Sequence, residues 1–219
     1  MTSEPYNLLR GNALQRLGLS KLPPELAGTA EHPVWMHPIE FSQIQAVLRT
    51  LNPKRMLEWG SGGSSRAWLK MLPQLELLWS VEHNPEWANT VRSSIDDPRF
   101  HLVHEPAVGT TEPHHIPGNK QTGAVHWAWC QTLEQDRNIM ARYIDSPDDA
   151  GGPFDVALVD GRARVFCLQK AFEVVRPGGM IILHDAQRTG YHATAYALGD
   201  PDFLEPWVQG QVCLLRVPE

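Results

Sequence analysis

The sequence predicts an α/β fold built on one doubly wound sheet, with five parallel strands and a C-terminal antiparallel hairpin. Three observations lead to this fold class. Strand and helix signals alternate from residue 55 to residue 184, a glycine-rich turn follows the first strand signal, and two short apolar runs surround Gln209-Gly210. Alternation of this kind places helices on both faces of a parallel sheet, and a two-residue turn joins antiparallel strands. We therefore expect seven strands in one sheet.

The first 51 residues precede the sheet. Residues 1–37 are rich in proline, glycine and polar residues, and we expect them to form an N-terminal arm over the core. The domain itself is expected over residues 38–219. It opens with a helix from Pro38, because proline suits a first helical position, and Asn52-Pro53 should end that helix. Its core-facing residues recur at helical spacing: Phe41, Ile44, Leu48 and Leu51.

The parallel strands are expected at short apolar runs between helical stretches. A helix over 165–175 should link the last two of them and end at a Pro-Gly-Gly turn. The closing hairpin should pair 203–208 with 211–217, and Pro206 restricts the first of these to an edge. The five parallel strands are expected at 55–59, 77–82, 100–105, 155–160 and 180–184.

One connection is much longer than a crossover needs. The 48 residues between Glu105 and Phe154 include a stretch, 124–143, that can form a helix. Long insertions at the C-terminal edge of such a sheet usually cover a site. We expect residues 107–153 to form a lid on the substrate side.

Composition excludes several function classes. A formal net charge of −6 argues against nucleic-acid binding, which usually needs a basic face. The three cysteines are far apart and lack metal-ligand spacing, so we expect free thiols in a reducing compartment. No secretory signal and no apolar run of about 18 residues is present, so no membrane contact is expected and the cytoplasm is the expected location.

The turn after the first strand predicts a binding site for S-adenosylmethionine (SAM). A glycine turn lets the backbone approach a ligand closely. Glu58 at its mouth would repel a diphosphate but suits a cation, and Ser65 stands where a dinucleotide fingerprint needs Gly or Ala. SAM has no phosphate and carries an ammonium and a sulfonium, so the turn favours SAM over NAD. The cofactor residues expected here are Glu58, Gly60, Ser61, Gly62, Ser64 and Ser65.

Other strand ends should complete this site, because ligands of open α/β sheets lie outside the carboxyl ends of the strands. Glu82 follows Glu58 by 24 residues and suits a carboxylate that accepts hydrogen bonds from both ribose hydroxyls, with His83 beside it. Pro106 and Ala107 are placed to flank the adenine.

The strand ends carry a set of motifs in order: Glu58 before Gly60-Ser61-Gly62, Glu82, Phe154-Asp155 then Val159-Asp160-Gly161, and Pro177-Gly178-Gly179. Together these motifs resemble those of class I SAM-dependent methyltransferases over about residues 38–217. Val-Asp-Gly-Arg with His-Asp resembles the small bacterial and polysaccharide or natural-product O-methyltransferases. The resemblance implies a Rossmann-like sheet, SAM as cofactor, and, in some relatives, a divalent metal such as Mg²⁺ held by acids that correspond to Asp160 and Asp185. Those relatives often have two adjacent acids where this chain has His184-Asp185, so metal dependence stays open.

These residues predict methyl transfer to an oxygen of a small molecule or sugar. His184 is the expected base or orienting group, because its unperturbed pKa lies near neutral. Asp160 and Asp185 are expected to position the acceptor, bind the SAM ammonium or chelate a metal, although both could simply cap helices. Arg162, Arg164 and Arg188 should bind a carboxylate or phosphate on the acceptor.

Several other functions remain open at the level of sequence. One is a SAM-binding enzyme that performs cyclisation or aminocarboxypropyl transfer, and another is a non-catalytic subunit with the same fold. An NAD-dependent oxidoreductase is disfavoured by Glu58 and Ser65. A homodimer is possible, as in many of these methyltransferases.

Overall fold

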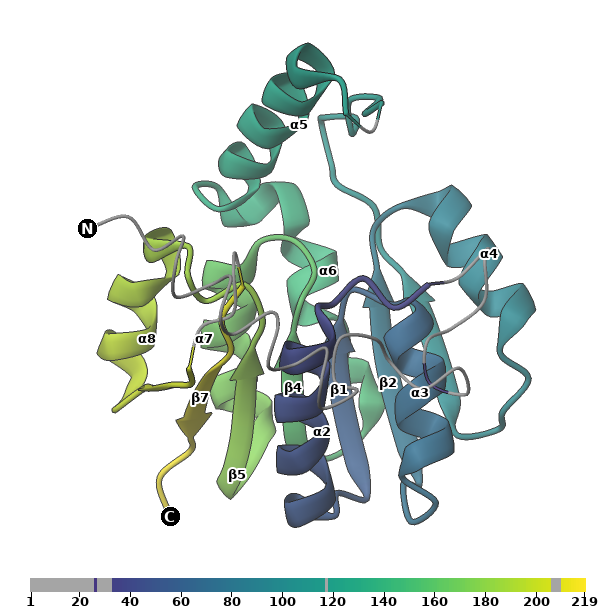
Figure 1. Ribbon diagram of the computed structural model, residues 1–219, viewed down its shortest axis with the longest axis vertical. Coiled ribbons are helices and arrows are strands. Elements are labelled where there is room, and N and C mark those ends of the chain that lie inside the picture. The colour runs from purple at the N-terminus through teal and green to yellow at the C-terminus, as the bar shows by residue number, and fades with distance from the viewer. Residues whose placement is uncertain (1–25, 27–32, 117, 206–209) are drawn as a thin grey trace, which may run out of the picture.

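A seven-stranded sheet forms the centre of the computed structural model, in the order β3-β2-β1-β4-β5-β7-β6 (Figure 1). The structure describes residue 26 and residues 33–116, 118–205 and 210–219. Most of the predicted N-terminal arm, residues 1–37, lies outside the described residues. The strands are β1 Arg55–Trp59, β2 Leu77–Glu82, β3 Phe100–His104, β4 Phe154–Val159, β5 Val175–Leu183, β6 Asp202–Phe203 and β7 Cys213–Arg216.

Strand directions confirm the predicted fold class. The five strands β1 to β5 pair in parallel, and β7 pairs antiparallel with both β5 and β6. Strand β5 begins at Val175, earlier than expected, with a register shift against β4 at Phe154 and Val156. Strand β6 covers only Asp202–Phe203, and the predicted edge residue Pro206 lies outside the described residues.

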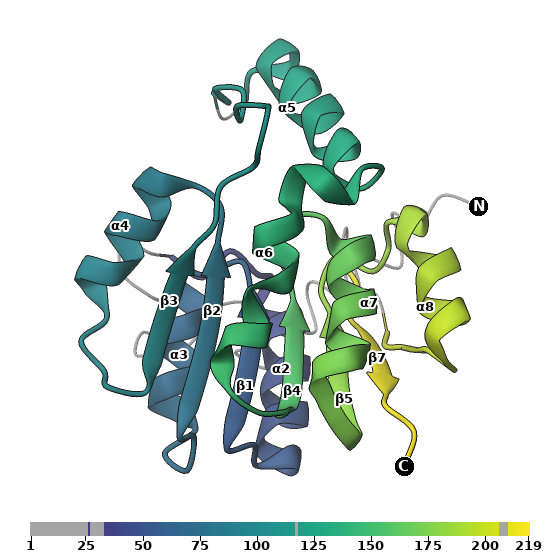
Figure 2. The same ribbon diagram turned by 180° about the vertical axis from the view of Figure 1, so that it is seen from behind.

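Helices cover both faces of the sheet. Helices α2 and α3 pack on one face, and α6 and α7 pack on the other (Figures 1 and 2). Alternate strand residues point to opposite faces, so Met56 packs with α2 and α3 while Leu57 packs in the other core. The helices are α2 Pro38–Leu51, α3 Gly63–Met71, α4 Pro85–Ser94, α5 Lys120–Leu133, α6 Ala141–Asp145, α7 Arg164–Val174 and α8 His192–Leu198.

Helix α2 has the expected bounds and the expected ends. The His37 side chain accepts a hydrogen bond from the Ile39 N–H, and Pro38 occupies the first turn. Asn52 takes a left-handed conformation, with φ 49°, and donates its N–H to the Leu48 carbonyl. Helix α2 therefore ends at Asn52-Pro53, as predicted.

The insertion between β3 and β4 is more broken than predicted. The single helix expected over 124–143 is wrong: α5 ends at Leu133, and a 3₁₀ turn, Arg137–Met140, precedes α6. Where α5 ends, the carboxylate of its C-cap residue Glu134 accepts the N–H groups of Arg164 and Val165 at the start of α7. A second 3₁₀ turn, Ser146–Ala150, follows α6.

Helix α5 stands beyond the carboxyl ends of the parallel strands and projects from the body of the molecule (Figures 1 and 2). It thus lies on the side of the sheet where a ligand is expected. Among the described residues, no helix has the length and apolar character needed to cross a membrane.

Candidate functional site

A cavity of about 780 Å³ opens at the carboxyl ends of β1, β2, β4 and β5. Its volume lies within the range usual for small-molecule sites. Asn84, in the predicted site segment after the second strand, also lines it. Trp35, Trp87, Glu112 and His115 line it too and were missed in the sequence, because no motif marks them. The predicted site residues on its wall are Gly60, Ser61, Gly62, Ser64, Glu82, His83, Asp160, Arg162, Arg164, His184, Asp185 and Arg188.

A second cavity of about 570 Å³ adjoins the first. It shares His83, Asn84, Glu112 and His115 with the first cavity, so the two form neighbouring compartments. Pro106 and Ala107, expected to flank an adenine, line only this second compartment.

The turn after β1 packs tightly against the turn after β4. Gly60 has φ 96° and donates its N–H to the Val81 carbonyl, while Asp160 donates its N–H to the Trp59 carbonyl. A Cβ atom at Gly60 would lie 2.8 Å from the Gly161 nitrogen. Glycine is therefore required at position 60 by both its φ angle and its surroundings.

Glu58 is placed differently from its prediction. Its side chain is fully buried beneath the turn and does not line the cavity. The hydroxyls of Ser65 and Ser80 both donate to Glu58 Oε1, the latter at 2.6 Å. Burial raises the pKa of Glu58 to about 7 against the opposing effect of these two hydrogen bonds. Glu58 and Ser65 thus anchor the first turn of α3 to the sheet, and neither reaches the mouth of the cavity.

Glu82 lies where the sequence places it. It is 4 % exposed and lines the cavity at the end of β2. Its Oε1 accepts the backbone N–H groups of His83 and Asn84, both at 2.8 Å. These bonds hold the carboxylate in one orientation.

Glu112 joins the insertion to the end of β2. It accepts hydrogen bonds from Asn84 at 2.9 Å, and its oxygens lie 3.2 Å from His83 Nε2 and 2.9 Å from His126 Nε2. Although burial opposes ionisation, these contacts lower the pKa of Glu112 well below its usual range. They also raise the pKa of His83 despite its burial. Glu112 was missed because it stands in the least patterned part of the chain.

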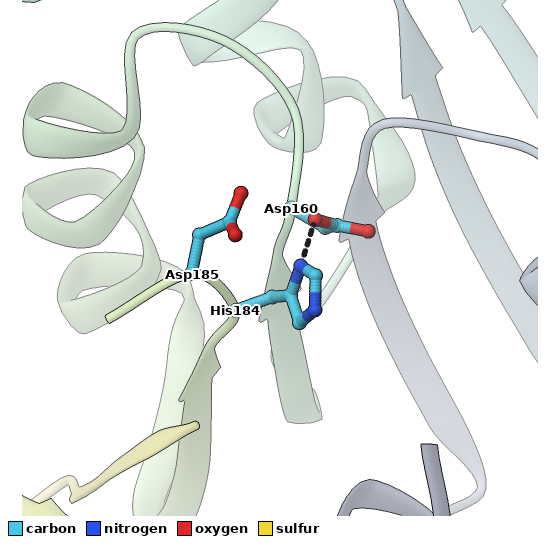
Figure 3. Close-up of side chains that lie close together, drawn as sticks. All are labelled: Asp160, His184 and Asp185. Carbon is cyan, nitrogen blue, oxygen red and sulfur yellow. Dashed lines mark hydrogen bonds and ion pairs between the residues drawn. The ribbon is translucent and has the colours of Figure 1, made fainter. Parts of the chain in front are cut away.

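His184 lies between two carboxylates. Its Nδ1 is 2.6 Å from Asp160 Oδ1 (Figure 3), and its Nε2 is 3.3 Å from Glu40 Oε1, an ion-pair distance without hydrogen-bond alignment. Burial alone would lower the pKa of His184, but Asp160, followed by Glu40, raises it to about 10. An imidazolium has no lone pair to accept a proton, so this raised pKa disfavours the predicted role of His184 as base at neutral pH. The predicted role as orienting group remains.

Replacement of His184 by glutamine should lower the free energy of unfolding near neutral pH and flatten its pH dependence. In the wild type, protonated His184 stabilises the folded state, and this stabilisation is fully present below the unfolded-state pKa of 6.5. It is lost as pH rises through about 10, because only the folded state retains the proton between these two values. The loss should be on the order of a few kcal/mol. Urea unfolding of both proteins from about pH 6 to about pH 10 measures it. Parallel stability curves for the two proteins would contradict the charged state of His184.

The three arginines differ in their surroundings. Arg164 is 3 % exposed, lies between the ends of β4 and β5 and forms part of the cavity wall, which disfavours its predicted role in acceptor binding. Arg188 lies 2.9 Å from Asp185 and over the Trp127 ring, 5.0 Å from its centroid. Arg162 is 3.8 Å from Glu112 and, like Arg188, lines the cavity, as predicted.

Comparison with known proteins identifies the fold. No protein-family model and no curated protein matches the chain. Among solved structures, a candidate O-methyltransferase from Klebsiella pneumoniae is 16% identical, with 99% of each chain covered and a TM-score of 0.64. The O-methyltransferase TomG from Streptomyces achromogenes, solved with SAM, is 17% identical, with both chains fully covered and a TM-score of 0.60. A methyltransferase-like protein from Silicibacter pomeroyi is 20% identical over 86% of this chain and 90% of its own, with a TM-score of 0.58.

The chain has the class I SAM-dependent methyltransferase fold. Its cavity lies outside the carboxyl ends of the parallel strands, where ligand sites of open α/β sheets are generally found. The motifs at Glu58, Glu82 and Asp160 stand at the ends of β1, β2 and β4, as predicted, whereas Pro177-Gly178-Gly179 lies within β5 and not in a turn before it.

Within this methyltransferase fold, a metal site would have to use Asp160, His184 and Asp185. In the described part of the chain, these are the residues whose ligand atoms lie close enough together, within 4.8 Å of one another. The donor set does not fit Mg²⁺. Arg164 pairs with both carboxylates, and His184 Nδ1 is engaged with Asp160. Arg164 and His184, with Arg188, lower the pKa of Asp185 against its burial.

Proposed function

We propose that the chain is a SAM-dependent methyltransferase that acts on an oxygen of a small molecule or sugar. The observation that carries this proposal is the fixed Glu82 carboxylate at the end of β2, facing a cavity that also contains the Gly60–Gly62 turn. A carboxylate held in this way can accept hydrogen bonds from two ribose hydroxyls. Its backbone partners leave it no freedom to turn away.

The remaining parts of SAM fit the neighbouring wall. Gly60, Ser61, Gly62 and Ser64 would approach the methionine moiety, with Asp160 opposite as a partner for its ammonium. The second compartment, with Pro106, Ala107 and His83, would receive the adenine. The presence of SAM in the TomG structure supports the same use of the fold here.

Methyl transfer requires little chemistry from the protein beyond alignment. The acceptor oxygen must lie about 3–3.5 Å from the sulfonium methyl and in line with the bond that breaks. Asp185 offers carboxylate oxygens that can hold the acceptor hydroxyl and take its proton, while His184 orients Asp160 for the SAM ammonium. Arg162 and Arg188 would bind an anionic group elsewhere on the acceptor.

The insertion fits a cover for this site. Glu112 and His115 from residues 107–153 line both compartments, and Glu112 contacts the end of β2. We therefore assign residues 107–153 as a lid within a methyltransferase domain of residues 38–219. The free, buried cysteines Cys130, Cys167 and Cys213 support a reducing compartment such as the cytoplasm.

Titration calorimetry tests the cofactor, with SAM and S-adenosylhomocysteine as ligands and NADH as control. We expect both sulfur compounds to bind with micromolar dissociation constants and NADH to give no heat. Release of S-adenosylhomocysteine with hydroxylated acceptors would then establish methyl transfer, whereas a cyclised or aminocarboxypropyl product would indicate the other SAM chemistries. If the folded protein binds neither SAM nor its product, the proposal is overturned.

A further inference from the structure

We propose that the guanidinium of Arg164 occupies the place that a divalent metal ion would need between Asp160 and Asp185. The site would then carry its own fixed cation and bind no metal. This inference deepens the proposed function and rests on it for its meaning in catalysis. Its geometric basis is independent of any ligand.

The Arg164 guanidinium pairs with both strand-end carboxylates at once. Its Nη2 lies 3.3 Å from Asp160 Oδ1, and its Nη1 lies 3.1 Å from Asp185 Oδ2. Asp160 follows β4 and Asp185 follows β5, so one side chain joins two strands across the sheet edge. Asp185 has φ 60°, a left-handed conformation that places strain at this position.

Three backbone carbonyls complete the binding site of this guanidinium. Its N–H groups donate to the carbonyls of Gly161 at 2.9 Å, His184 at 2.5 Å and Asp160 at 2.7 Å. Five N–H donors in a planar group can satisfy three carbonyls and two carboxylates together, which an ammonium cannot do. Displacing Arg164 would leave these buried acceptors unpaired.

Electrostatic repulsion and existing ion pairs disfavour metal binding at this position. Metal ligands must be free of protons, and arginine cannot lose its charge to make room. Arg188 adds a second cation 2.9 Å from Asp185. Asp160 Oδ1 is also engaged by His184 Nδ1 at 2.6 Å. A divalent ion would have to break these contacts and share the site with two fixed positive charges.

Arg164 then acts as a positioning residue. It holds the Asp160 and Asp185 carboxylates in place at the cavity wall, which a metal ion does in other sites through coordination. The acceptor hydroxyl would then meet Asp185, a carboxylate held by the protein's own guanidinium.

Mn²⁺ titration followed by electron paramagnetic resonance tests this inference without any turnover. We expect the wild-type protein to leave the signal of free Mn²⁺ unchanged up to about 1 mM. Arg164→Gln removes the fixed charge and should bind Mn²⁺ at least about tenfold more tightly, since a like charge next to the ion is removed. Arg164→Lys keeps a cation and should resemble the wild type.

Two results would overturn the inference: wild-type binding of Mn²⁺ that Asp185→Asn abolishes, or a folded Arg164→Gln protein that binds no Mn²⁺. If Arg164→Gln does not fold, Arg188→Gln decides, because Arg164 remains in place and Mn²⁺ should still not bind. Binding by Arg188→Gln would assign the exclusion of metal to Arg188 and overturn the role of Arg164. A failed SAM titration would overturn the proposed function and leave these metal results unaffected.

Discussion

Replacing Glu82 with alanine should weaken SAM binding by roughly 1–3 kcal/mol, the cost of leaving buried ribose hydroxyls without acceptors. The effect should be among the largest of any single side chain in the cavity, because Glu82 also fixes the backbone of its neighbours. Its Oε1 accepts the N–H groups of His83 and Asn84, so the substitution frees the turn after β2. Calorimetric titration with SAM and S-adenosylhomocysteine measures the change.

Two further variants separate recognition from general damage. Glu82→Gln keeps one oxygen acceptor and should lose less affinity than Glu82→Ala. Asp96→Ala removes an exposed carboxylate just before β3, at the opposite end of the sheet, and should bind SAM as the wild type does. Unchanged affinity in Glu82→Ala would remove Glu82 from the cofactor site.

Replacing Gly60 with alanine should lower the free energy of unfolding by about 2–4 kcal/mol, the combined cost of a strained φ angle and overpacking. The new Cβ would meet backbone rather than a mobile side chain, with the Gly161 nitrogen at 2.8 Å and the Gly161 Cα at 2.9 Å. Backbone at the end of β4 cannot yield without displacing Asp160. We therefore expect SAM binding to be lost together with stability.

Gly62 provides the matched control for this prediction. It lies in the same turn, but its φ of 172° is extended backbone, and a Cβ there would have its nearest contact at 3.6 Å, with the Trp87 ring. Gly62→Ala should therefore melt close to the wild-type temperature, whereas Gly60→Ala should melt roughly 5–15 °C lower. Equal melting temperatures for the two variants would show that the contact between the turns after β1 and β4 is not a constraint.

The sequence by itself determined the sheet and most of the cavity wall. Alternating strand and helix signals are local, and parallel strands connected by helices place their carboxyl ends at one edge. Glu82, Asp160 and Asp185 could therefore be assigned to one site from their positions after three strands. The turn at Gly60 could also be predicted, because its conformation depends on glycines that are adjacent in the sequence.

Only the tertiary structure decided which charged groups pair. Glu40 reaches His184 from α2, and Glu134, at the end of α5, binds the start of α7. No periodic pattern in the sequence indicates either contact, because each joins segments that are remote in the sequence. Glu58 and Arg164 carry charges that suit a ligand, yet the fold surrounds them with hydroxyls, carbonyls and carboxylates of the protein. Charge on a side chain can be read from sequence, whereas the partner that neutralises it depends on distances that exist only after folding.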